Sequence, residues 1–169
     1  MSRILDAIDV VIGWIAAMIL LITFCLLTFS VFARYVAVGW QIDWILEVVV
    51  FAIAWAVLLG VARIEKRAGH IRVDFVVARL GDRWQRTAEI LSLLFALAVG
   101  LFFVWSGKLV VEDAIRWGER TDSTLRIPLW VYYSALSTSF AIHALFILQR
   151  LYNVIRGAPL MMHGEDLAD

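Results

Sequence analysis

Residues 10–33 read VVIGWIAAMILLITFCLLTFSVFA, a run of 24 residues without a formal charge. As an α-helix this run is about 36 Å long, enough to cross a hydrocarbon core of about 30 Å. Three further apolar stretches follow, at residues 44–62, 90–107 and 127–149. A backbone inside a bilayer must satisfy its own hydrogen bonds, and the alternating pattern of a membrane barrel is absent here. The sequence therefore predicts four transmembrane helices.

The composition fits a chain that lies almost entirely in the membrane. Hydrophobic residues make up 63% and charged residues 18% of the chain, against roughly 45–50% and about 25% in soluble domains. At 169 residues the sequence has no room for a folded extramembrane domain of the usual size. We therefore predict one all-α transmembrane domain over residues 1–169. The equal numbers of basic and acidic residues give no indication of a nucleic-acid partner.

Seven of the fifteen basic residues gather between the second and third apolar stretches. Within residues 71–86, apolar side chains recur at helical spacing on one face and arginines gather opposite. This pattern predicts a short amphipathic helix that lies flat on the membrane surface. The basic residues are candidates for contacts with anionic phospholipid head groups. They are Arg63, Lys66, Arg67, Arg72, Arg79, Arg83 and Arg86.

The placement of the basic residues also predicts the orientation. The two termini and the connector between the second and third stretches hold ten of the fifteen, and the other two connectors hold five. Basic residues concentrate on the cytoplasmic side of membrane proteins. Both termini are therefore predicted to be cytoplasmic. Aromatic residues expected at the outer interface agree with this orientation; they are Trp40, Trp44, Trp105 and Trp130.

Ionisable residues are rare inside the predicted spans. Stretches 10–33 and 90–107 have none, Glu47 stands near the outer end of the second span, and His143 lies past the middle of the fourth. Transport pathways and membrane enzymes usually place such groups deep in the bilayer, often at Gly or Pro breaks in the helices. The sequence therefore predicts no catalytic, cofactor-binding or metal-binding residues.

Glu47 and His143 each have alternative interpretations. Glu47 suits a proton carrier, an ion pair with Arg34 or a polar contact with a neighbouring subunit, and its shallow position favours a contact. His143 suits a haem or metal ligand only if a second histidine faces it, and both His70 and His163 lie outside the spans. A hydrogen-bonded histidine between packed helices is the interpretation we favour.

Several short motifs occur in a recognisable order. Arg34-Tyr35 closes the first span, Trp44 and Glu47 open the second, and Gly60 stands near its end. The sequence Gly69-His70-Ile71-Arg72-Val73-Asp74 follows, and Thr124-Leu125-Arg126-Ile127-Pro128-Leu129-Trp130 leads into the fourth span. In this order and spacing the chain resembles the small transmembrane subunit, of the DctQ or SiaQ type, of tripartite ATP-independent periplasmic (TRAP) transporters.

The resemblance implies that the chain is a subunit without a catalytic or solute-binding site of its own. In that family the small subunit pairs with a large elevator-type permease subunit that carries the sodium and substrate sites, and a periplasmic binding protein delivers the solute, commonly an organic acid. The chain is then expected to be a non-catalytic scaffold in a bacterial inner membrane, without a cofactor. The matching residues become candidates for partner contacts or structural roles: Arg34, Tyr35, Trp44, Glu47, Gly60, His70, Asp74 and Pro128.

Two other classes of protein remain as alternatives. One is an autonomous small transporter that works as a homodimer, which usually carries an acid in its first transmembrane helix; residues 10–33 lack one. The other is the membrane anchor of a respiratory enzyme, for which paired haem ligands are missing. The sequence does not identify the solute.

Overall fold

The structure of the chain is a computed structural model that describes residues 2–37, 39–40, 42–66 and 82–156. This part of the chain consists of four long helices and the segments between α1 and α2 and between α4 and α5. Their bounds are Ser2–Tyr35 for α1, Ile45–Lys66 for α2, Asp82–Trp117 for α4 and Leu129–Ile155 for α5. All four are long and apolar enough to cross a membrane, which confirms the prediction of four apolar spanning helices.

The helices α1, α4 and α5 extend well beyond the apolar stretches that predicted them. For example, α4 runs for 36 residues around the predicted stretch 90–107, because the polar residues on either side contain no helix breaker. It ends before Gly118, whose φ of +61° favours glycine. Pro128 directly precedes α5 with an extended backbone, as expected for a proline at a helix start.

The structure describes only the last part of the segment predicted to form an amphipathic helix, residues 71–86. Residues 67–81 lie outside the described part of the chain. Residues 82–86 form the first turns of α4, so the predicted boundary at residue 86 is wrong. The physical reason is that residues 82–90 carry no glycine or proline, so the helix continues into the span without interruption.

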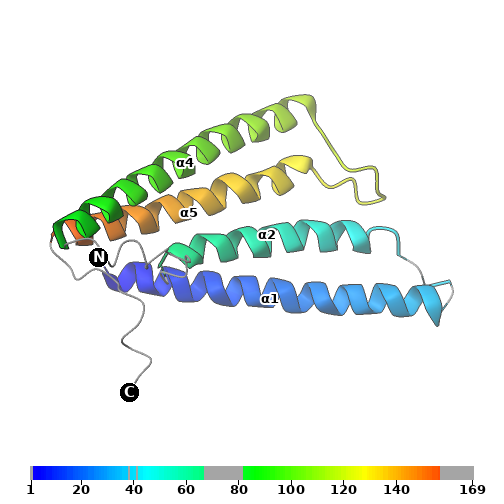
Figure 1. Ribbon diagram of the computed structural model, residues 1–169. Coiled ribbons are helices and arrows are strands. Elements are labelled where there is room, and N and C mark those ends of the chain that lie inside the picture. The colour runs from blue at the N-terminus through cyan, green and yellow to red at the C-terminus, as the bar shows by residue number, and fades with distance from the viewer. Residues whose placement is uncertain (1, 38, 41, 67–81, 157–169) are drawn as a thin grey trace, which may run out of the picture.

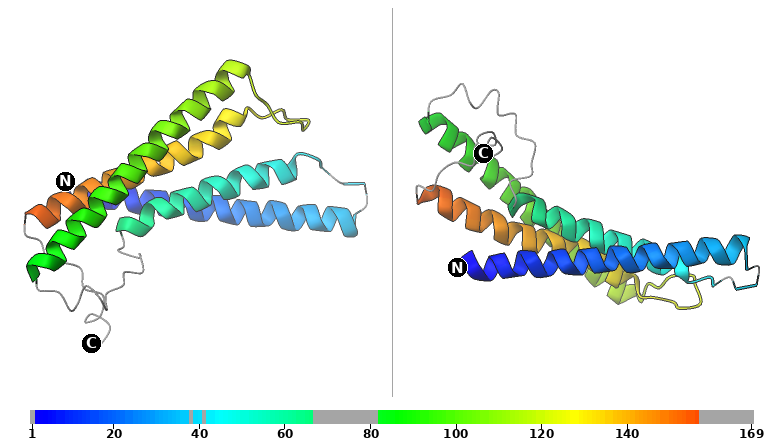
Figure 2. Two further views of the ribbon diagram at one scale, coloured as in Figure 1. Left: turned by 45° about the horizontal axis from the view of Figure 1, so that its top comes forward. Right: turned by 90° about the horizontal axis from the view of Figure 1, so that it is seen from below.

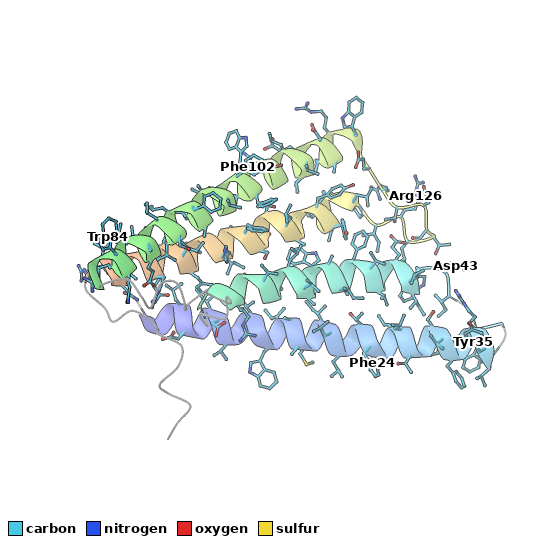
Figure 3. All side chains as sticks on the ribbon, in the orientation of Figure 1. Phe24, Tyr35, Asp43, Trp84, Phe102 and Arg126 are labelled. Carbon is cyan, nitrogen blue, oxygen red and sulfur yellow. The ribbon has the colours of Figure 1, made fainter. Side chains whose placement is uncertain are left out.

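The four helices form a single row in the order α1, α2, α5, α4 (Figure 1). Neighbours in the sequence are antiparallel, whereas α2 and α5 run in the same direction in the middle of the row. The helices converge at the end where α1 begins and α5 finishes. Toward the opposite end, which we call the open end, the α1–α2 pair and the α4–α5 pair spread apart (Figure 2). Tyr35, Asp43 and Arg126 lie at the open end (Figure 3).

Packing between the helices relies on small side chains and two apolar clusters. One cluster joins α1, α2 and α5 through Ile12, Leu59 and Phe146. The other joins α4 and α5 through Leu93 and Ile147. Buried alanines bring the backbones close together at many other points, as is usual for membrane helices.

A single row of helices leaves wide apolar surfaces uncovered. Large hydrophobic side chains are exposed along the whole length of α1 and α4, including Trp14 at 70% and Phe95 at 74%. Phe24 and Phe102 project from the two edges of the row (Figure 3). Surfaces of this extent are rare on monomeric soluble proteins, so lipid or another protein must cover them.

Candidate functional site

An ion pair joins α1 and α2 at the convergent end. Nε of Arg63 lies 2.7 Å from Oδ1 of Asp9, and the two side chains are only 19% and 11% exposed. Gly13, one turn after Asp9, leaves room for this contact, because a Cβ at that position would collide with the Arg63 guanidinium. Arg63, predicted as a lipid contact, thus has a partner within the chain, and the sequence analysis missed Asp9.

A second ion pair joins α4 and α5 at the same end. Nη2 and Nε of Arg150 lie 2.6 Å and 3.0 Å from Oε1 of Glu89. The side chains are 15% and 4% exposed. All four paired residues stand directly beside the apolar stretches, and opposite charges flank consecutive spans on one side of the membrane. That placement is the signal from which the sequence could have predicted both pairs.

Glu47 behaves differently from these two acids. Both of its carboxylate oxygens are buried, and neither has a hydrogen-bond partner in the described part of the chain. The predicted ion pair with Arg34 is not formed. Arg34 lines a hollow beside Leu46, whereas Glu47 lies on a different side of α2.

Glu47 lies on the side of α2 that packs against α5. One turn further into α2, the ring of Phe51 packs on Tyr132 with 5.2 Å between centroids. Nε1 of Trp55 donates a hydrogen bond of 3.1 Å to the carbonyl of Val131. These contacts, one and two turns from Glu47, place its carboxylate near the start of α5.

A groove of about 250 Å³ opens where the two helix pairs separate. We call it the outer groove. It is almost entirely apolar, and small residues such as Ala54 and Ser106 are part of its lining. Its lining residues come from α2, α4 and α5: Ala54, Leu58, Ser106, Gly107, Val110, Tyr132, Tyr133 and Leu136.

The remaining residues singled out from the sequence are scattered. Arg34 lines a smaller hollow of about 160 Å³ with Ser30 and Asp43. Tyr35 is exposed at the end of α1, Trp44 is half-buried before α2, and nothing lies within 4 Å of a Cβ added to Gly60. Arg86 is exposed on α4. The side chains that lie outside the described part are those of Lys66, Arg67, His70, Arg72, Asp74, Arg79 and Arg83.

His143 is buried in α5, between α4 and its own helix neighbours. Its ring meets Phe140 edge to face at 5.9 Å, and its Cδ2 approaches Gly100 of α4. No group of three His, Cys, Asp or Glu side chains that could bind a metal ion occurs within the described residues.

These features define the class of the protein: a multi-pass helical membrane protein whose candidate site is an interaction surface. Residues 23–157 match the family described as "Tripartite ATP-independent periplasmic transporters, DctQ component". The chain belongs to this family, which confirms the resemblance seen in the motifs.

Two relatives of this chain are much longer proteins. It is 26% identical over 136 residues to the isethionate TRAP transporter permease protein DctMQ of Oleidesulfovibrio alaskensis, covering 78% of this chain and 21% of that protein. It is 28% identical over 130 residues to an uncharacterized protein, y4mM, of Sinorhizobium fredii, covering 77% of this chain and 24% of that protein. The chain thus spans about a fifth to a quarter of the length of these relatives.

Proposed function

We propose that this chain is the small, non-catalytic membrane subunit of a TRAP transporter. It scaffolds a large elevator-type permease subunit in the sodium-coupled import of an organic acid, which a periplasmic binding protein delivers. The observation that carries the proposal is the single row of helices, which offers wide apolar surfaces and buries few ionisable groups. Family membership supports the same conclusion.

The charged residues of the row favour a scaffold over a solute pathway. The buried acids Asp9 and Glu89 are each joined to an arginine at the convergent end. Such pairs fix the geometry of two helix hairpins, because removing one partner leaves an uncompensated buried charge. A rigid frame of this kind suits a subunit against which a larger subunit moves.

The similarity to the DctMQ protein supports a partnership with a larger permease part. In that protein the matched segment is only 21% of the chain, and the name describes a TRAP transporter permease. We propose that a separate large subunit supplies the corresponding remainder here.

We propose the orientation of the chain in the membrane together with its function. With both termini cytoplasmic in a bacterial inner membrane, the two ion pairs lie at the inner face, and Glu47 and the outer groove lie toward the periplasm. The basic residues between α2 and α4 would then meet anionic phospholipid head groups at the cytoplasmic surface.

Uptake by cells and by proteoliposomes tests the function. Deleting the chain from a strain that carries the complete transporter should abolish uptake of radiolabelled organic acids, isethionate among them, and restoring it should recover uptake. The purified chain alone should bind none of these solutes. Accumulation of solute by liposomes that contain only this chain would refute the proposal.

A further inference from the structure

We propose that Glu47 and the outer groove form the contact for one transmembrane helix of the large subunit, and that this helix brings a lysine or arginine to the Glu47 carboxylate. The inference rests on the proposed function, since it assigns a place on this chain to the partner which that function requires. The carboxylate without a partner and the groove are separate observations that point to the same end of the row.

Among the described residues, Glu47 differs from the buried acids Asp9 and Glu89 because its carboxylate has no hydrogen-bond partner. The other two buried acids described, Asp9 and Glu89, have arginine nitrogens at 2.7 Å and 2.6 Å. Glu47 has both carboxylate oxygens buried and no hydrogen-bond partner within the described residues. Burying an ionised carboxylate without a partner is costly, so a partner from outside the chain would stabilise it strongly.

The described basic residues at the open end do not supply this partner. Arg34 lines the hollow beside Leu46 and makes no hydrogen bond to Glu47. Lys108 and Arg116 face Glu112 and Asp113 on their own helix. Arg120 donates to the carbonyl of Arg126 in the connector, and neither arginine makes a hydrogen bond to Glu47. We infer that the charge complement comes from another molecule.

The outer groove lies on the same stripe of α2. Glu47, Phe51, Ala54 and Leu58 follow one another at spacings of four, three and four residues, so they share one face of the helix. Ala54 lines the groove and lies about 10 Å along the axis from Glu47. A helix seated in the groove can thus place a long basic side chain beside the carboxylate.

The lining favours a helix as the occupant. Ala54 and Ser106 are small enough to allow close approach of another backbone, as at many contacts between membrane helices. An acyl chain would fill the groove as well, so the test must distinguish crosslinks to lipid from crosslinks to protein. Glu47 is half-buried as a residue, so part of its side chain lies at the helix surface.

Photo-crosslinking in cells with the complete transporter tests the place of contact. We expect p-benzoylphenylalanine in place of Tyr133 or Leu136, both in the groove, to crosslink to the large subunit. The same probe in place of Trp14, exposed on α1, is the matched control and should give at most a tenth of that product. Crosslinks from the groove only to lipid or to a second copy of the chain would overturn the inference.

Substitution of Glu47 tests the charge. Glu47→Gln should lower co-purification with the large subunit on the order of tenfold, whereas the exposed control Glu112→Gln should leave it unchanged. The isolated Glu47→Gln chain should unfold in detergent at the same temperature as the wild type or higher, because it no longer buries a charge without a partner. This second measurement separates a lost contact from a misfolded variant.

The outcomes separate this inference from the function on which it rests. If the wild-type chain co-purifies with the large subunit and supports uptake, but Glu47→Gln co-purifies normally, the inference is wrong and the proposed function stands. If the wild-type chain does not co-purify at all and its deletion leaves uptake intact, the proposed function itself is wrong.

Discussion

Nε of Arg63 in α2 lies 2.7 Å from Oδ1 of Asp9 in α1, at the end of the row where all four helices converge. The equivalent contact between Arg150 and Glu89 closes the α4–α5 pair at the same end. Each hairpin of antiparallel helices is therefore joined by an acid and an arginine, and the two hairpins separate only toward the open end (Figure 1).

Neutralising one member of the first pair is expected to destabilise the protein. Arg63→Gln removes the guanidinium that lies 2.7 Å from Asp9, and breaking a buried ion pair costs about 3–5 kcal/mol in soluble proteins. The double variant Asp9→Asn with Arg63→Gln should recover much of the loss, because both charges of the pair are then removed together. Thermal unfolding in detergent micelles measures both effects.

The exposed pair of Lys108 and Glu112 provides the control for this experiment. Its side chains are 64% and 52% exposed, so Lys108→Gln should change the unfolding free energy by less than about 1 kcal/mol. Equal losses for Arg63→Gln and Lys108→Gln would contradict a special role for the buried pair.

The second pair depends on the shape of arginine as well as on its charge. Both Nε and Nη2 of Arg150 donate to Oε1 of Glu89, and lysine has a single terminal nitrogen that cannot reproduce this fork. Arg150→Lys is therefore expected to lose roughly 1 kcal/mol of unfolding free energy, and Arg150→Ala roughly 3 kcal/mol or more. An Arg150→Lys variant as stable as the wild type would show that charge alone suffices.

Gly107 and Gly60 should respond in opposite ways to the same substitution. A Cβ on Gly107 would lie 3.0 Å from Cβ of Ser137 and 3.3 Å from its backbone nitrogen, so Gly107→Ala should force α4 and α5 apart and cost roughly 1–3 kcal/mol. Nothing lies within 4 Å of a Cβ on Gly60, so Gly60→Ala should stabilise the isolated chain by up to about 1 kcal/mol.

Co-purification then decides whether Gly60 serves a contact with the large subunit. If Gly60→Ala stabilises the isolated chain but weakens its association with the large subunit, the glycine serves a contact with that partner. If Gly60→Ala changes neither the stability of the isolated chain nor its co-purification with the large subunit, Gly60 is not an interface residue and is not required for packing.

The sequence predicts the spans well and the packing poorly, for a physical reason. Long charge-free runs such as residues 10–33 identify helices that cross the bilayer. The faces that meet other helices are as apolar as those that meet lipid, so periodicity does not reveal the order α1, α2, α5, α4. The position of Glu47 predicts a polar contact but not its partner, because the sequence does not reveal which side of α2 meets α1 and which meets α5.

Cysteine labelling tests the predicted orientation and, through it, the side on which the ion pairs lie. Cys25 is the single cysteine, so Cys25→Ser gives a background without thiols. In that background Asp43→Cys, exposed at the open end, should react with a membrane-impermeant maleimide in intact cells whose outer membrane is permeabilised. Arg156→Cys, exposed just after α5, should react only after the inner membrane is opened. The reverse labelling pattern would place both termini and both ion pairs in the periplasm. The basic residues between α2 and α4 would then also be periplasmic, contrary to the positive-inside rule.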